Sequence, residues 1–416
     1  MNKITKYAFS DLYEMASGIS TTKAQAGHGD PFVSFSTVFN NYFLPDELPD
    51  LMATSPKEQK TYSIQMGDIL VTRTSETIDE LAMSCVATKD YPRATYSGFT
   101  KRLRPKTQGI AYDKYLAFYL RGYLFRNAVT NNAFMTLRAS FNEDIFSFLS
   151  LYLPDYSEQV KIGDLLYNME QKKKNNIRIC AELESMAKTL YDYWFVQFDF
   201  PDENGKPYCT SGGDMVWYDQ MKRESPKGCN VGNLFDIAEF INGLACQKYR
   251  PSEGEASLPV IKITEMHDGI TDNTERVSIN IPTKNKIADG DILFSWSATL
   301  EVMYWFGGNG GLNQHIFKVE PKKDFSQDYI YHQLSAYVIN FVKMAEARKT
   351  TMGHITSDHL QQSRIVLPPK KYIDDFTKVI KPIHEKLGKA QQENRELTKL
   401  RDWLLPMLMN GQATIK

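Results

Sequence analysis

The chain has 416 residues, of which 42% are hydrophobic and 24% charged, and its net charge is −1. This length allows two or three domains with separate cores, and the composition is that of an ordinary globular protein. No apolar run reaches the roughly 18 residues of a membrane span, and the first residues lack the order of a secretory signal. The five cysteines form no CxxC pair, which is typical of reduced thiols. We therefore expect a cytoplasmic protein, in which any positive surface is local.

An internal repeat is the main feature of the sequence. Gly18-Ile19 recurs as Gly243-Leu244 at an offset of 225, and the tetrapeptide that begins at Gly67 recurs at Gly290 at an offset of 223. Further along, the offset settles at 214, in the pairs Tyr115 and Tyr329, Leu120 and Leu334, Tyr123 and Tyr337, Leu183 and Leu397, and Leu190 and Leu404. An ordered series of matches with a constant tail indicates two copies of one module.

The front part of each copy is rich in short alternating runs bounded by turn residues. Such runs predict strands at 32–35 and 68–73 in the first copy, and at 260–263 and 291–296 in the second. Helical patches follow at 114–128 and 328–347. Each front part is therefore expected to be a strand-rich domain with a few helices.

The back part of each copy is expected to be one long helix. In the first copy ten residues, most of them apolar, follow one another at spacings of four and three: Ile162, Leu166, Met169, Lys173, Asn176, Cys180, Leu183, Ala187, Leu190 and Trp194. The second copy repeats the pattern at Ile383, Leu387, Ala390, Asn394, Leu397, Arg401, Leu404 and Leu408. These heptad seams predict a coiled coil, although packing of each seam inside its own domain is an open alternative. Pro382 and Pro406 should kink or segment the second helix.

The predicted fold is α+β. Two strand-rich domains form a pseudo-twofold tandem repeat and are separated by two long helices packed as an antiparallel coiled coil. The expected boundaries are 1–154 for the first strand-rich domain, 155–198 for the central helix, 199–368 for a linker with the second domain, and 369–416 for the distal helix.

Catalytic motifs are missing from the sequence. There is no G-x-x-x-x-G-K-[ST] phosphate loop, no cofactor-binding turn of an amino-methyltransferase and no metal-ligand spacing of histidines. A loose nuclease-like pattern, Pro49-Asp50 followed by Glu58-Gln59-Lys60, arises readily by chance in a charged protein. We therefore expect no catalytic residues and no metal ligands in this chain.

A basic run with interleaved aromatic residues, Lys89 to Lys106, favours DNA binding. A solvated strand face is the alternative for any one of its lysines. Loops at matched positions of the two copies keep their place but change their side chains, as expected of two domains that read different sequences. The candidate DNA-binding residues are Thr22, Lys23, Arg73, Lys101, Arg102, Arg138, Gln247, Lys248, Lys262, Trp296, Lys349, Thr351 and His354.

The stretch Leu183 to Trp217, with its run Tyr191-Asp192-Tyr193-Trp194-Phe195 and its later Asn204-Gly205-Lys206-Pro207-Tyr208, resembles a known family. It is similar to the central region of specificity subunits of bacterial type I restriction-modification systems. The segments Met352 to Ile355 and Leu397 to Gly411 agree, so the resemblance covers essentially the whole chain. One departure is Pro226-Lys227-Gly228-Cys229, where the family often has Pro-x-Gly-Trp.

The resemblance implies two target recognition domains, each reading one half of a bipartite DNA site, with the helices as spacer. It also implies assembly with two modification (methyltransferase) subunits that use S-adenosylmethionine, and through them with restriction subunits that use ATP and magnesium. This chain would bind none of those cofactors. The alternatives are a stand-alone nuclease or fused modification enzyme, and a repeat scaffold that binds only protein.

Overall fold

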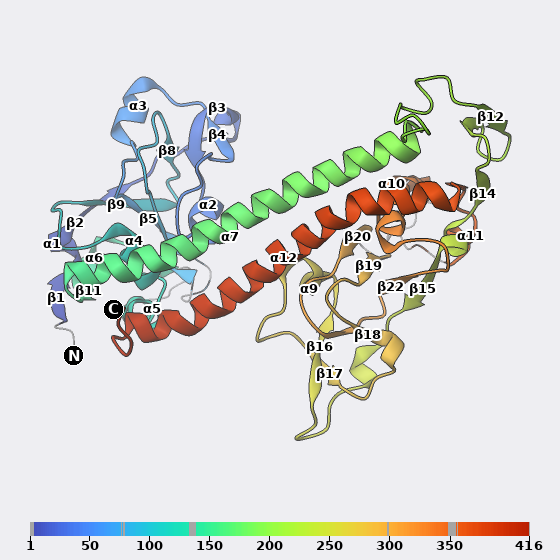
Figure 1. Ribbon diagram of the computed structural model, residues 1–416. Helices are drawn as coiled ribbons and strands as arrows, with labels where there is room; N and C mark the ends of the chain where they lie inside the picture. Colours follow the sequence, from blue (N-terminus) through green and yellow to red (C-terminus); the bar gives the residue numbers. More distant parts are fainter. Residues whose placement is uncertain are drawn as a thin grey trace. The chain divides into compact units, whose positions relative to one another are not determined.

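The computed structural model describes residues 4–75, 77, 80–132, 139–297, 299–347, 355 and 357–415 (Figure 1). The chain forms two compact units. Unit 1 comprises Met1–Lys172 and Leu397–Lys416, and unit 2 comprises Lys173–Glu396. Each unit therefore contains part of both long helices, α7 (Tyr156–Tyr191) and α12 (Lys370–Met409).

Unit 1 is built around two small sheets. The first has strand order β2-β9-β5-β7 and the second β4-β3-β8, and the pairs β1–β11 and β6–β10 lie outside them. Its elements before α7 are β1 (Thr5–Ala8), α1 (Phe9–Leu12), β2 (Tyr13–Ser17), η1 (Lys23–Gln25), β3 (Ala26–Val33), α2 (Phe35–Asn40), β4 (Asp50–Met52), α3 (Pro56–Thr61), β5 (Ile69–Thr72), β6 (Thr74–Ser75), β7 (Ser84–Val86), β8 (Thr95–Tyr96), β9 (Thr100–Pro105), α4 (Asp113–Tyr119), α5 (Tyr123–Asn132), β10 (Ala139–Ser140), α6 (Glu143–Phe148) and β11 (Ser150–Leu153).

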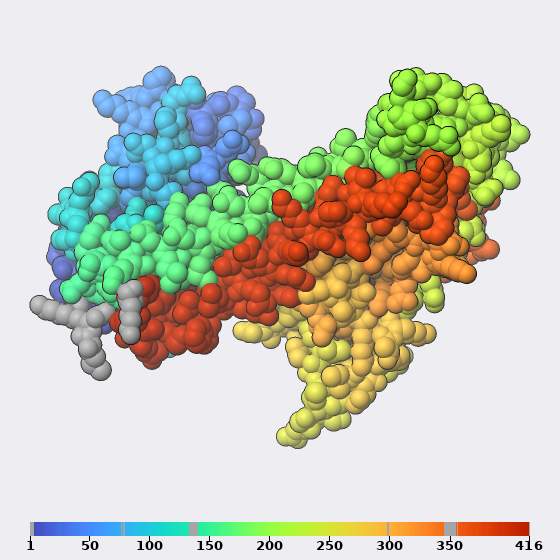
Figure 2. Space-filling model, in the orientation of Figure 1, coloured from blue at the N-terminus to red at the C-terminus, as the bar shows by residue number. Residues whose placement is uncertain are grey.

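Unit 2 has the same plan. Its sheets have the orders β15-β22-β19-β20 and β17-β16-β21-β18, with the pairs β14–β23 and β12–β13 outside them. Its elements are η3 (Asp192–Val196), β12 (Met215–Tyr218), β13 (Arg223–Pro226), β14 (Asn230–Gly232), α8 (Leu234–Ile237), β15 (Ala238–Asn242), η4 (Cys246–Lys248), β16 (Ser257–Ile261), α9 (Ile263–Asp268), β17 (Arg276–Ser278), η5 (Thr283–Asn285), β18 (Lys286–Ile287), β19 (Ile292–Ser295), β20 (Glu301–Tyr304), β21 (Gly310–Leu312), β22 (Ile316–Pro321), α10 (Gln327–Ala347), α11 (Ser357–Gln361) and β23 (Ile365–Leu367). Figure 2 shows that the yellow residues around β16 and β17 project away from α12.

Strand pairing confirms the internal repeat. β3 pairs in parallel with β8 through Phe32 and Val33, and β16 pairs in parallel with β21 through Val260 and Ile261. The four-stranded orders β2-β9-β5-β7 and β15-β22-β19-β20 also correspond, as do β1–β11 and β14–β23. The predicted α+β fold with two strand-rich copies in tandem is therefore correct.

The two units have separate hydrophobic cores. The main core of unit 1 contains Phe9, Leu103 and Phe118, with Leu408 of α12 packed against them. The main core of unit 2 contains Phe294, Phe341 and other residues between Ala187 and Ile380. All five cysteines are free thiols. Among the described residues, none of the helices combines the length and apolar character needed to cross a membrane.

The two long helices pair in antiparallel fashion within each unit. In unit 2, Asn176 of α7 bonds Asn394 of α12, and further along α7 the Cys180 thiol contacts the Leu387 carbonyl. In unit 1, an ion pair joins Glu170 to Arg401. The predicted seam residues of both helices are buried or partly buried, so the antiparallel coiled coil is confirmed.

Three local features do not follow from the sequence pattern. The prolines do not divide α12, which is one helix from Lys370 to Met409, and both Pro382 and Pro406 are exposed on it. Tyr123 is 77% exposed whereas Tyr337 is 8% exposed. The reason is that the chain turns between α4 and α5, where unit 2 has the single helix α10, and this turn places Phe125 inward instead. Trp217 is 57% exposed on the hairpin β12–β13.

Candidate nucleic-acid interface

Three segments of unit 1 meet at one end of the sheet β2-β9-β5-β7. Ile19, just after β2, forms a bridge with Ser97, and the amide of Gly98 donates to the Ile19 carbonyl at 2.7 Å. The amide of Arg73, just after β5, donates to the Phe99 carbonyl at 2.8 Å. The turn at 18–23, the turn at 97–99 and Arg73 therefore form one surface, called here the reading end of unit 1.

Unit 2 builds its reading end with two of these backbone contacts. Leu244 bridges Asn313, and the amide of Trp296 donates to the His315 carbonyl. The reading end of unit 2 therefore comprises the turn at 243–248, the turn at 313–315 and Trp296. The amide of Ser278 donates to the Tyr249 carbonyl, which places the first of these turns against β17.

The repeated glycines Gly18 and Gly243 are needed for this close approach. A Cβ atom at Gly18 would lie 2.0 Å from the carbonyl oxygen of Ser97, and one at Gly243 would lie 2.0 Å from that of Asn313. Side-chain atoms cannot occupy such a contact with backbone. Both glycines therefore allow two turns of the reading end to touch.

Several candidate residues of unit 1 lie at its reading end. Thr22 and Lys23 are exposed at the start of η1, where the side chain of Gln25 accepts a hydrogen bond from the Thr22 hydroxyl. Arg73 is also exposed and donates to the Gly98 carbonyl at 3.3 Å. Its remaining guanidinium N–H groups can reach a phosphate or a base edge.

Lys101 and Arg102 are held by unit 1 itself. Lys101 is 8% exposed and its ammonium donates to the Ser17 hydroxyl at 2.9 Å. Burial lowers the pKa of Lys101, and the nearby charge of Arg73 acts in the same direction. Arg102 donates to the Ser63 carbonyl at 2.6 Å and lies over the Tyr96 ring.

Other cations of the predicted basic run also form ion pairs or hydrogen bonds within unit 1. Arg93 pairs with Asp30, Arg104 pairs with buried Asp68 at 2.6 Å, and Lys106 donates to the Ser10 carbonyl. Much of this run therefore stabilises the fold of unit 1. Arg73 and Lys23 are better placed than these residues to contact DNA.

In unit 2, Gln247 and Lys248 are exposed on the 243–248 turn. Trp296 packs against the rings of His315 and Phe317. Lys262 directly follows Ile261, whose carbonyl accepts from the amide of Asn313, and it forms a 2.8 Å ion pair with Glu275. These four residues lie at or beside the reading end.

Arg138, Lys349, Thr351 and His354 lie outside the described residues. The segments that follow them are anchored to the reading ends. The Phe141 amide donates to the Arg73 carbonyl at 2.7 Å, and the Ile355 amide donates to the Trp296 carbonyl at 3.1 Å.

Phe99, which the sequence offered only as an aromatic residue of the basic run, and Gln314 and His315, which were not among the candidates, also lie at the reading ends. Phe99 is 64% exposed beside Arg73, and the Nδ1 atom of His315 is buried with no hydrogen-bond partner in the described part of the chain. These residues occupy equivalent turns at an offset of 216, inside the stretch where the repeat offset drifts. Aligning the turns at 97–99 and 313–315 separately could have found them.

No described group of three or more His, Cys, Asp or Glu residues could hold a metal ion. Glu58, the nuclease candidate, instead accepts hydrogen bonds from the amide and hydroxyl of Ser55 at the start of α3. These contacts lower its pKa. Glu58 is therefore a helix-capping residue.

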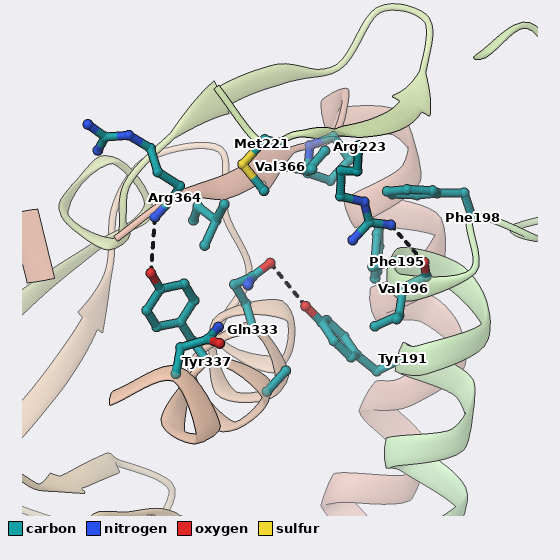
Figure 3. A pocket seen from close by; sticks show the side chains of 14 residues that line it. Tyr191, Phe195, Val196, Phe198, Met221, Arg223, Gln333, Tyr337, Arg364 and Val366 are labelled. Atoms are coloured by element: carbon teal, nitrogen blue, oxygen red, sulfur yellow. Dashed lines mark hydrogen bonds between the residues drawn. The ribbon is translucent and has the colours of Figure 1, made fainter. Parts of the chain in front are cut away.

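A small cavity of about 200 Å³ in unit 2 lies between the end of α7, the β12–β13 hairpin and α10 (Figure 3). The Tyr191 hydroxyl donates to the Gln333 side chain, Arg223 donates to the Val196 carbonyl, and the Arg364 amide donates to the Tyr337 hydroxyl. None of the reading-end residues lines this cavity.

The chain matches the type I restriction modification DNA specificity domain over residues 2–185 and 226–398. It belongs to this family, and the match falls on both copies of the repeat.

Two similar curated proteins are named as specificity subunits of type I restriction enzymes. The chain is 26% identical over 321 residues to the Type I restriction enzyme HindI specificity subunit of Haemophilus influenzae, which covers 65% of this chain and 70% of the relative. It is 21% identical over 404 residues to the MjaIX specificity subunit of Methanocaldococcus jannaschii, covering 88% of each. The crystal structure of the type I S subunit from M. genitalium shares the fold, with a TM-score of 0.61, 13% identity and coverage of 98% of this chain and 96% of that one.

Proposed function

We propose that this chain is the DNA-reading subunit of a type I restriction-modification complex. Each strand-rich domain binds one half of a bipartite DNA site through its reading end. The observation that carries this proposal is the repeated reading end itself. Two of its backbone contacts are the same in both units, while Arg73 and Lys23 in one unit and Trp296 and Gln247 in the other present different side chains. Different side chains on one scaffold are what two different half-sites require.

The proposed partners supply the chemistry. Two modification subunits methylate adenine with S-adenosylmethionine, and restriction subunits that join them cleave DNA with ATP and magnesium. The paired helices α7 and α12 set the number of unread bases between the half-sites. The proposal is supported by the family match over both copies and by the use of Glu58 as a helix cap, and it assigns this chain no catalytic role.

The test is selection of methylated sites from random DNA by the chain assembled with its modification subunits. We expect two separated blocks of specified bases. Arg73→Ala should relax only one block and Gln247→Ala only the other, because these residues belong to different reading ends. One contiguous block, or simultaneous relaxation of both blocks by either substitution, would contradict the proposal.

The alternative of a stand-alone nuclease is not favoured. It predicts magnesium-dependent cleavage by the isolated chain that Glu58→Ala abolishes. A capping role predicts only a small loss of helix stability. Incubating the isolated chain and its Glu58→Ala variant with plasmid DNA and magnesium distinguishes the two.

A further inference from the structure

A groove in unit 2 is separate from its reading end. It has a volume of about 740 Å³ and lies between the last turns of α7, the strand β20 and the helices α10 and α12. Tyr304, Tyr331 and Ile339 line its apolar part, and Glu184 and Glu301 line its polar part. None of the reading-end residues is among its lining.

The internal repeat shows what fills the matching position in unit 1. At the offset of 214, Ala187 corresponds to Arg401 and His384 to Glu170. Arg401 forms a 2.7 Å ion pair with Glu170, and its guanidinium lies 5.7 Å from the centre of the Tyr42 ring. Unit 1 therefore fills this position with an arginine held by an acid and an aromatic ring.

At the equivalent positions unit 2 has neither the arginine nor its acid, because Ala187 and His384 stand there, but two other acids and two tyrosine rings line the groove. Ala187 lines the groove with only a methyl group, and Tyr304 and Tyr331 offer aromatic faces. Glu184 of α7 forms no ion pair within the described part of the chain. His384 is paired with Asp328 and bonded to His332 at the floor of the groove.

The electrostatics of the groove favour a cation. Loss of water around Glu184 raises the pKa of its carboxyl group, and the Glu301 carboxylate raises it further, while His384 acts in the opposite direction. Glu301 has an ion pair with His267, and Lys188 is paired with Asp192. A guanidinium placed between Glu184 and Glu301 would relieve their repulsion, and its planar face suits the tyrosine rings.

We infer that this groove receives an arginine side chain from the modification subunit. The inference rests on the proposed function, from which it takes its partner. The arginine enters from outside the chain and occupies the position that Arg401 fills in unit 1. Its guanidinium pairs with Glu184 and Glu301, and its methylene stem packs against Tyr331.

The experiment measures the affinity of the full chain for its modification subunit by titration calorimetry. Ala187→Arg, which supplies the missing arginine from α7 itself, should weaken assembly tenfold or more. The near-isosteric double variant Glu184→Gln with Glu301→Gln should do the same and should flatten the salt dependence. Glu182→Gln, an exposed acid on the same helix that pairs with Arg178, should change nothing. The double variant keeps the test valid if Ala187→Arg fails to fold.

A direct test places a photoreactive phenylalanine analogue at Ser185, which lines the groove. The cross-linked peptide of the modification subunit should contain an arginine at or beside the attachment point. Wild-type affinity in both groove variants, or a cross-linked peptide without arginine, would overturn the inference and leave the proposed function intact. Failure of the unaltered chain to bind the modification subunit would overturn both.

Discussion

The side-chain amide of Asn176 donates a hydrogen bond of 3.0 Å to Oδ1 of Asn394 in the seam between α7 and α12. It also donates to Glu393 at 2.7 Å, and Asn176 is almost fully buried. A buried polar pair of this kind defines the register of a coiled coil, because any shift along the seam leaves its groups unbonded.

Asn176→Ala is therefore expected to lower the free energy of unfolding by about 1–3 kcal/mol, because it removes two hydrogen bonds inside a buried seam. Urea denaturation followed by circular dichroism measures the change. Asn175→Ala is the matched control, since Asn175 is exposed on the same turn of α7. Equal effects of the two substitutions would show that the buried pair has no special role.

Gly18→Ala is expected to weaken recognition of one half-site at least tenfold. The added Cβ would lie 2.0 Å from the Ser97 carbonyl oxygen and would force two turns of the reading end apart. Competition binding with DNA altered in either half-site measures the effect. Ser20→Ala, in the same turn but exposed, should leave binding unchanged, and an equal loss at both half-sites would argue against separate reading ends.

Lys23→Ala is expected to reduce the salt dependence of DNA binding. Removing one cation that neutralises a phosphate makes the slope of log K against log salt concentration shallower by about 0.9. Fluorescence anisotropy between low and moderate salt provides the slope. Lys378→Ala, an exposed lysine on α12 that pairs with Asp375, should keep the original slope. An unchanged slope in Lys23→Ala would show that this residue does not bind a phosphate.

Acid should destabilise the chain through His332. Burial lowers the pKa of His332 to about 3, and the neighbouring His384 acts in the same direction. Its usual pKa in the unfolded chain is about 6.5. The unfolded chain therefore takes up a proton first, so the stability that neutral His332 provides is complete above about pH 6.5 and declines as the pH falls toward 3.

His332→Phe should flatten this decline, because the phenyl ring does not titrate. Phe118 occupies the equivalent position of unit 1 at the offset of 214, so the substitution suits the fold. Urea unfolding at pH 7, 6 and 5 compares the two proteins. Parallel pH profiles would show that His332 does not contribute.

Lengthening both helices should change the spacing of the DNA site. One heptad inserted after Ile177 and another after Glu393 add about 10 Å to each helix, which corresponds to roughly three base pairs. Selection of methylated sites should return the same half-sites with a longer gap. The same gap as in the original protein would mean that the helices do not set the spacing.

The helices and the repeat were the most predictable parts of the fold. The helices were predictable because the seam residues around Asn176 and Leu387 recur at helical spacing. The repeat was predictable in part because Gly18 and Gly243 stand where no other residue fits against a neighbouring carbonyl. The course of α12 through Pro382 was not predictable, since packing on both sides of a proline outweighs its local effect.

The candidate site was predictable in its turns but less so in its side chains. Arg73 and Lys248 were found because their turns repeat. Lys101 and Arg102 were chosen for charge alone, and only the fold shows that Ser17 and Ser63 engage them. Phe99 was noted only as part of the basic run, and His315 was not found, because their turn lies where insertions separate the two copies.

The reading ends are held together by amide and carbonyl groups, such as the bond from the Arg73 amide to the Phe99 carbonyl. Groups of the main chain are present whatever the side chain is, so residues at these positions can be exchanged while the turns keep their shape. Such a protein can acquire a new DNA target by a few substitutions, without first having to rebuild its fold.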